Sequence, residues 1–207
     1  AKEAYRWVEA GALERPVAYG AAVSTRHGVV CIGGNDAART YADAFLLRWN
    51  PGTQSVERLP LPALPVPCAN GCATNIGERI YVAGGCTGLG LETAQAQFWS
   101  LNLPEVVSGA SVWESLPVWP GPSRAFAIAA AQRNGVDECV YILSGRRRNE
   151  QGVTEFLSDV YEFSPGKADP WRRRADVPRC VMAGTGMAVG NRGIVVLSGA
   201  DGALFDQ

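Results

Sequence analysis

Short apolar segments recur along the chain, and four of them end on a pair of small residues. The pairs are Gly33-Gly34, Gly84-Gly85, Ser144-Gly145 and Ser198-Gly199. Their second residues stand at positions 34, 85, 145 and 199, so the repeat is 51 to 60 residues long. The apolar spacing typical of an amphipathic helix is absent, and the pattern predicts an all-β chain.

The residues around each doublet complete a unit of four strands. A segment rich in small residues precedes the doublet strand, and a third and a short fourth strand follow it. The expected first strands cover residues 17–24, 68–75, 124–132 and 180–189. Trp113 and Trp171 stand at matching places in the fourth strands, where we expect them to pack the sheets together. Four strands in a repeat of about 50 residues are typical of kelch repeats, which form the blades of β-propellers.

We therefore predict one kelch-type β-propeller domain of four-stranded antiparallel blades, with about four blades' worth of chain. The blades are expected at about 15–60, 66–117, 122–175 and, in part, 178–207, with residues 4–9 as the closing strand of a further blade. An open ring leaves sheet faces and edges uncovered. Missing C-terminal blades or a second chain are therefore expected to close it. For a ring of six blades, about 110–120 further residues are needed.

Composition excludes several classes of function. The chain has 207 residues, 47% hydrophobic and 19% charged, which is enough apolar surface for a folded core. Its net charge of −1 gives no long-range field for nucleic acid. No apolar run approaches about 18 residues, so we expect no membrane insertion. His27 is the single histidine and no CxxC pair occurs, so neither a metal site nor a cofactor is expected.

The candidate binding residues are those that the repeat brings to one face. In a propeller, the loops after second strands and before first strands open around the central channel, the usual binding site. Arginine outnumbers lysine by 17 to two, and guanidinium groups suit carboxylate recognition. Arg124 is the first choice for substrate contact because it leads into an innermost strand. The full set of candidates is Asn35, Asn70, Arg124, Arg146 and Asp201.

The order of the units resembles that of the bacterial N-acetylneuraminate (sialic acid) mutarotases, also called epimerases. The stretch from Trp7 through Ala18-Tyr19-Gly20 to Leu46 is similar to that family's final blade. The segments 65–85, 120–161 and 182–199 resemble its first blade, its second blade and the start of its third. The chain thus begins with the family's last blade, which implies the cyclically permuted branch. Arg124 and Tyr19 match family positions, and Tyr19 is expected to pack beneath the channel.

The resemblance implies a six-bladed isomerase that accelerates anomer exchange of sialic acid or a related acidic sugar. The family's catalytic Glu and Arg lie in a loop of a later blade, so they are expected beyond Gln207, and the chain alone is predicted to be inactive. The nearest look-alike, 35–39, has Asn35 where an acid is expected. The resemblance also implies a periplasmic or secreted protein, with a cytoplasmic location as the alternative.

A non-catalytic kelch propeller remains the alternative function. Such a module would bind a protein or a glycan through the loops of its top face, and would expose aromatic side chains there. Trp119 and Phe205 are the candidates for that role.

Overall fold

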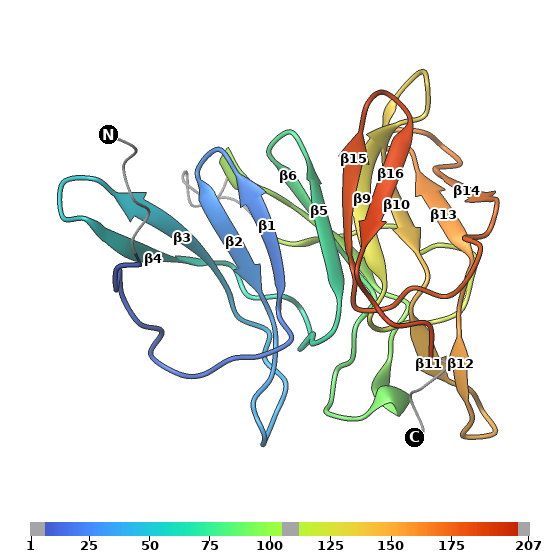
Figure 1. The fold of residues 1–207 in the computed structure, drawn as a ribbon, viewed down its shortest axis with the longest axis horizontal. Helices are drawn as coiled ribbons and strands as arrows, with labels where there is room; N and C mark the ends of the chain where they lie inside the picture. Colours follow the sequence, from blue (N-terminus) through green and yellow to red (C-terminus); the bar gives the residue numbers. More distant parts are fainter. Residues whose placement is uncertain (1–6, 105–111, 203–207) are drawn as a thin grey trace.

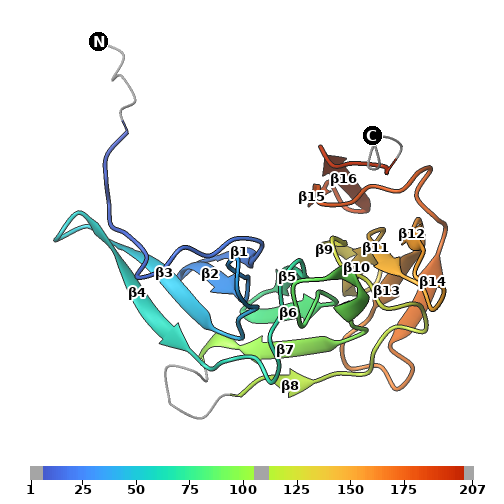
Figure 2. The same cartoon turned by 90° about the horizontal axis from the view of Figure 1, so that it is seen from below.

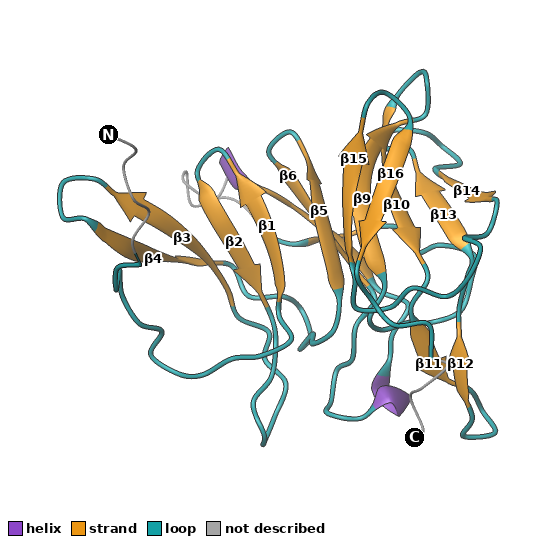
Figure 3. Ribbon diagram, viewed as in Figure 1, coloured by secondary structure: helices purple, strands orange, loops and turns teal. Residues whose placement is uncertain are grey.

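The computed structural model describes residues 7–104 and 112–202, which are built almost wholly of antiparallel sheets (Figures 1 and 3). Sheet 1 contains β1 (Ala21–Thr25), β2 (Gly28–Ile32), β3 (Ala44–Asn50) and β4 (Ser55–Leu61). Sheet 2 contains β5 (Cys72–Ile76), β6 (Arg79–Ala83), β7 (Phe98–Asn102) and β8 (Glu114–Ser115). Sheet 3 contains β9 (Ile128–Arg133), β10 (Glu138–Leu143), β13 (Val160–Phe163) and β14 (Trp171–Arg174). The predicted all-β fold of four-stranded antiparallel sheets is confirmed.

Smaller elements complete the described chain. β15 (Thr185–Val189) and β16 (Gly193–Leu197) form a hairpin beside sheet 3. β11 (Arg146–Arg148) and β12 (Thr154–Phe156) form a hairpin within the loop that follows β10. A single 3-10 turn, η1 (Leu91–Thr93), lies in the equivalent loop of sheet 2. The β11–β12 insertion accounts for the longest of the three repeat spacings.

The sheets follow one another along an arc (Figure 2). Their first strands lie on its inner side, while β4, β8 and β14 lie on the outside. The core fills the spaces between neighbouring sheets, because each sheet packs both of its faces. Sheets 1 and 2 bury Val30, Val82 and Trp113 together, and sheets 2 and 3 enclose a cluster that includes Phe98 and Trp171.

The two tryptophans of the fourth strands join neighbouring sheets. The indole N–H of Trp113 donates to the carbonyl oxygen of Pro62 at 2.8 Å, and that of Trp171 donates to Pro117 at 2.7 Å. Both acceptors lie in the segments that lead out of the preceding sheet. Each ring is more than nine-tenths buried. The tryptophans therefore act as packing anchors, as their repeated placement suggested.

The first strands begin four or five residues later than predicted. β1 starts at residue 21 and β5 at residue 72, because a residue with positive φ interrupts the extended chain just before each of them. The same interruption precedes β9 and β15. The interrupting residues are Tyr19 (φ 57°), Asn70 (56°), Phe126 (59°) and Ala183 (55°).

The N-terminal closing strand expected over 4–9 stays a prediction. Residues 7–9 belong to no strand, and the Trp7 side chain is wholly exposed. Residues 4–6 lie outside the described residues. Just after this segment, the carbonyl oxygen of Ala10 accepts a hydrogen bond from the Val56 amide at 2.9 Å, so the chain reaches the edge of sheet 1 there.

Candidate functional site

A cavity of about 320 Å³ opens where the inner strands converge. Four short segments line it, one from each sheet and one from the β15 hairpin. They are residues 20–22, 71–73, 127–129 and 184–186. Most of these residues are glycine or alanine, because larger side chains would fill the space where four strands approach one axis. The small-residue composition of the first strands therefore shapes a cavity.

The loops after the doublets surround one end of this cavity. In sheets 1 and 2 they fold back as tight hairpins, with bridges between Asn35 and Thr40 and between Cys86 and Ala94. In sheet 3 the β11–β12 hairpin takes that place. These loops gather at the lower side of Figure 1, which we call the loop face. The turn that carries His27 lies at the opposite side, between β1 and β2.

The residues with positive φ form a hydrogen-bonded belt around the axis. The amide of Asn70 donates to the carbonyl oxygen of Tyr19 at 2.8 Å, and the amide of Phe126 donates to that of Asn70 at 2.8 Å. The amide of Ala183 then donates to Phe126 at 2.9 Å. Tyr19 is 65% exposed, so the expectation that it packs beneath the channel is wrong.

The belt also fixes which loop residues are equivalent. The residue before each belt position pairs with the residue after a doublet, and the four paired loop residues are Asn35, Cys86, Arg146 and Ala200. Asp201, a predicted candidate, lies one position beyond the equivalent place. Asn70 belongs to the belt itself, whereas Arg124 lies two residues before the belt position of its sheet.

Arg124 is fully buried at the joint between sheets 2 and 3. Its guanidinium donates to both carboxylate oxygens of Asp159 at 2.8 Å, and to the Ser144 carbonyl oxygen at 3.0 Å. The rings of Trp119 and Tyr161 each lie 5.4 Å from its central carbon. Direct contact with a substrate would require this bidentate pair to open. In the structure Arg124 holds the joint together beneath the loop face.

The Arg124 ion pair keeps Asp159 ionised. Burial alone would raise the pKa of Asp159, but the hydrogen bonds and the charge of Arg124 outweigh it, and the pKa is lowered. A carboxyl group with a lowered pKa is a poor proton donor near neutral pH. Asp159 therefore has a structural role in this arrangement.

Arg146 is the partly buried guanidinium of the loop face. Its central carbon lies 4.3 Å from the centre of the Phe126 ring, within the range of a cation–π contact. Burial lowers the pKa of Arg146, and the thiols of Cys86 and Cys180 are the groups whose charge acts on it. The next residue, Arg147, pairs with Glu155 at 2.6 Å on the same hairpin.

The loop that resembles the family's catalytic segment is held by its acid. The Asp36 carboxylate accepts hydrogen bonds from the Tyr41 hydroxyl and from the amides of Ala38 and Arg39, the latter two at 2.8 and 2.9 Å. Led by the Tyr41 bond, these contacts lower the pKa of Asp36 to about 2. Asn35, a predicted candidate, donates through its side-chain amide to the Asp36 carbonyl oxygen at 3.0 Å. Asp36 stabilises the loop and is unsuited to carry a proton at neutral pH.

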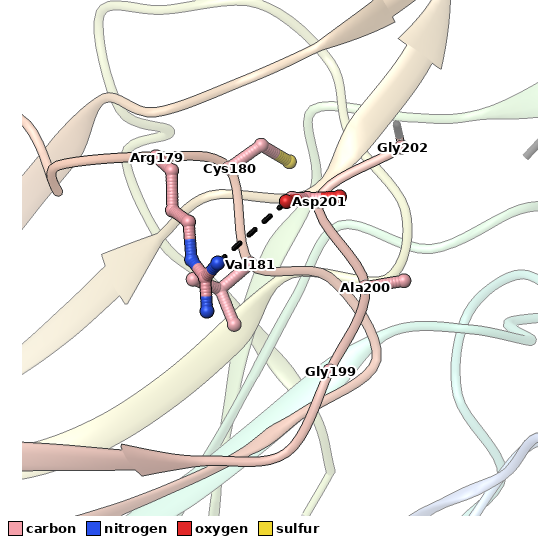
Figure 4. A pocket seen from close by; sticks show the side chains of 7 residues that line it. All are labelled: Arg179, Cys180, Val181, Gly199, Ala200, Asp201 and Gly202. Carbon is pink, nitrogen blue, oxygen red and sulfur yellow. Dashed lines mark ion pairs between the residues drawn. The ribbon is translucent and has the colours of Figure 1, made fainter. Parts of the chain in front are cut away.

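A second hollow lies on the loop face beside the β15–β16 hairpin. Its volume is about 330 Å³, and residues 179–181 and 199–202 line it (Figure 4). The guanidinium of Arg179 reaches toward the Asp201 carboxylate at 3.7 Å across this hollow. Both side chains are largely exposed.

Sequence reasoning missed the two residues that organise the site. Phe126 carries the Arg146 contact and Asp159 holds Arg124, yet neither was among the candidates. A signal for Phe126 was present, because Ala-Tyr-Gly, Ala-Asn-Gly and Ala-Phe-Ala recur before three of the first strands. No comparable pattern marks Asp159, whose partner is 35 residues away.

Two further classes of site were searched for in the described residues. Within 7–104 and 112–202, no group of three or more His, Cys, Asp and Glu side chains is placed to hold a metal ion. In the same part of the chain, no helix has the length and apolar character needed to cross a membrane.

The fold and the cavity define a class of protein. Four-stranded antiparallel sheets that meet at an axial cavity, with loops gathered at its mouth, make a β-propeller-like binding protein or enzyme. Residues 61–207 match the model of the family described as N-acetylneuraminate epimerase, which is more than half of the chain. The chain belongs to the N-acetylneuraminate epimerase family.

Individual relatives agree with this assignment. The N-acetylneuraminate epimerase of Haemophilus influenzae strain PittEE is 26% identical over 154 residues, which cover 74% of this chain and 37% of the relative. That of Pasteurella multocida strain Pm70 is 25% identical over 145 residues, 70% of this chain and 34% of the relative. The chain thus spans about a third of the length of these relatives.

One solved structure supports the fold. The structure titled "Structure of YjhT" superposes with a TM-score of 0.61 at 12% sequence identity. The match covers 98% of this chain and 83% of that chain. At this identity the likeness shows the fold alone.

Proposed function

We propose that the protein accelerates exchange between the α and β anomers of N-acetylneuraminate or of a closely related acidic sugar. The observation that carries the proposal is the match of residues 61–207 to the N-acetylneuraminate epimerase family. The relatives named above bear the same description. Because the chain spans about a third of their length, the proposal concerns the ring that contains these sheets.

The proposed architecture is a six-bladed kelch propeller in which sheets 1 to 3 are blades and β15–β16 begins a fourth. The arc of sheets supports it, and so does the exposed apolar surface at its ends. In the hairpin, Met187 is 50% exposed and Leu197 is 52% exposed. Further blades, expected beyond Gln207, would cover these side chains and close the ring.

Anomer exchange needs a proton placed on the ring oxygen and another removed from the anomeric hydroxyl. A carboxyl group with a pKa near the working pH serves such steps best. Asp36 and Asp159 have lowered pKa values and are committed to structural hydrogen bonds. We therefore propose that the acid and base come from a later blade, and that the sheets described above supply binding groups.

The proposed binding groups are those that face the cavity mouth. Arg146 provides a partly desolvated cation, and Asn35, Asn70 and Asp201 lie on the loop face around it. A guanidinium can hold a sugar carboxylate by paired hydrogen bonds. Arg124 supports this set from below through the joint between the sheets.

The alternative of a non-catalytic binding module has lost one of its two supports. Trp119 is 2% exposed, and its indole N–H donates to the Pro122 carbonyl oxygen at 3.0 Å. It therefore offers no aromatic surface to a partner. Phe205 lies outside the described residues.

The proposal is tested by following anomer exchange directly. Crystalline N-acetylneuraminate starts as a single anomer when freshly dissolved, and the approach to equilibrium is followed by proton NMR. We expect the protein with its complete ring to shorten that approach relative to buffer. An unchanged rate at micromolar protein would remove this substrate from consideration.

A further inference from the structure

Phe126 has an uncommon backbone conformation for a large residue. Its φ of 59° lies in the left-handed region, where glycine, asparagine and aspartate predominate. The equivalent positions of the neighbouring units carry Asn70 and Ala183, which are smaller. Strained residues of this kind are concentrated at functional sites. The question is what the ring of Phe126 does there.

The backbone around Phe126 is held from three directions. Its amide donates to Asn70 in sheet 2, and its carbonyl oxygen accepts from Ala183 beside the hairpin, as the belt requires. The preceding residue, Ala125, exchanges two hydrogen bonds of 2.9 Å with Arg146. The direction of the Phe126 side chain is therefore fixed by contacts with three structural units.

The fixed ring lies against the guanidinium of Arg146. The distance from the ring centre to the central carbon of Arg146 is 4.3 Å. Residues 127–129, which follow Phe126 directly, line the axial cavity. Of the three consecutive arginines, Arg147 pairs with Glu155 and Arg148 is exposed. Arg146 is thus the one that an aromatic face holds at the cavity mouth.

Contact through the face of a guanidinium leaves its chemistry along the edge. The N–H donors of arginine lie in its plane and match the two oxygens of a carboxylate. An aromatic ring against the face restricts the side chain without using those donors. Burial of Arg146 also reduces the solvent competition for its charge.

We propose that Phe126 is a positioning residue that holds Arg146 as the carboxylate-binding group at the mouth of the axial cavity. The inference rests on the proposed function for its choice of acidic sugar. The ligand class is a sugar acid whose carboxylate meets the edge of Arg146 and whose ring enters the cavity. Phe126 itself contributes no hydrogen bond to it.

The test measures binding of N-acetylneuraminate to the complete protein by calorimetry. Phe126→Leu removes the aromatic face and is expected to weaken binding about tenfold. Phe126→Tyr keeps the face and is expected to restore affinity. Tyr19→Leu is the matched control, because it makes the same kind of change at the equivalent belt position, where φ is 57°.

The coupling with Arg146 separates positioning from general damage. Arg146→Met is expected to weaken binding, and adding Phe126→Leu to it is expected to have little further effect. Additive losses in the double variant, or equal losses in Phe126→Leu and Tyr19→Leu, would overturn the inference. A neutral sugar, N-acetylmannosamine, serves as the probe without a carboxylate, and its affinity is expected to be unaffected by Phe126→Leu.

Failure of the proposed function gives a different result. If the wild-type protein binds N-acetylneuraminate and Phe126→Leu weakens that binding, the inference stands even when no anomer exchange is accelerated. If exchange is accelerated while both Phe126→Leu and Arg146→Met bind normally, the inference is overturned and the proposed function stands. Absence of any binding of N-acetylneuraminate to the wild-type protein would overturn the inference.

Discussion

Two buried carboxylates in sheet 3 each have several hydrogen-bond partners. Asp159 accepts both bonds from Arg124, and Glu162 accepts from Arg174, Tyr141 and Asn134 at 2.8 to 3.0 Å. Glu162 is fully buried. Burial would raise the pKa of each acid, but these partners outweigh it and the pKa of both is lowered. The two acids are therefore ionised components of the fold.

Breaking the Arg124 pair should destabilise the protein strongly. Asp159→Asn leaves the Arg124 guanidinium buried without its counter-charge, and we expect the free energy of unfolding to fall by about 3–5 kcal/mol. Urea denaturation measures the change. Glu57→Gln is the control, because its pair with Arg48 is largely exposed and is expected to be worth about 0–1 kcal/mol. Equal losses in the two variants would contradict the structural role given to Arg124.

The same two acids predict how stability depends on pH. Because the pKa of each is lowered in the folded state, their contribution is present above the unfolded value of about 4. It is lost as the pH falls through the lower, folded pKa. Urea midpoints are therefore expected to fall steeply below about pH 4, and less steeply in Asp159→Asn. Stability that rises on acidification would contradict the assignment.

At the scale of the element, the doublets are where one sheet meets the next. The amide of Gly34 donates to the Cys68 carbonyl oxygen at 2.7 Å, and that of Gly85 donates to Arg124 at 2.8 Å. In sheet 3 the first doublet residue is Ser144, with φ of 60°. Its hydroxyl accepts from the Val181 amide at 2.6 Å and donates to the Leu157 carbonyl oxygen. A side chain therefore makes at this doublet the connection that backbone makes at the others.

Close approach makes glycine necessary at Gly84. With φ of 62°, a Cβ there would lie 2.5 Å from the Arg124 carbonyl oxygen. Gly77 has φ of 57° and nothing within 4 Å of its Cβ position, which makes it a matched control. We expect Gly77→Ala to cost about 1 kcal/mol and Gly84→Ala to cost about 1–3 kcal/mol more. Thermal unfolding compares them, and equal losses would show that the sheets do not meet as described.

The repeat predicted the sheets but not the register at their inner ends. Doublets, apolar runs and repeated tryptophans follow local rules, so the strands could be found from the sequence. Extended chain was expected through Tyr19 and Phe126, because nothing in their chemistry favours a left-handed backbone. Hydrogen bonds from neighbouring sheets hold them there. That displacement also explains why Asp201 was chosen instead of Ala200.

The candidate site was predicted at the level of its face, and less well at the level of its residues. Arg146 and Asn35 do follow doublets on the loop face. Arg124 precedes an inner strand as expected, but its partner Asp159 lies far away in sequence and takes it into the core. Whether a guanidinium faces solvent or a buried carboxylate depends on such a pairing, which no local pattern reveals.

At the scale of the whole molecule, the arc of sheets and the family assignment lead to one proposal. The axial cavity and the loop face provide binding groups, and the described acids are committed to the fold. Acid and base for anomer exchange are proposed to come from later blades. The complete ring should therefore be active where these 207 residues are not.

The most direct measurement compares anomer exchange in three samples of freshly dissolved N-acetylneuraminate. One contains the protein with its complete ring, one contains the 207-residue chain, and one contains buffer. Proton NMR follows the approach to equilibrium in each. We predict acceleration by the complete ring and a rate equal to that of buffer for the 207-residue chain. No acceleration by the complete ring, or equal acceleration by both proteins, would contradict this account.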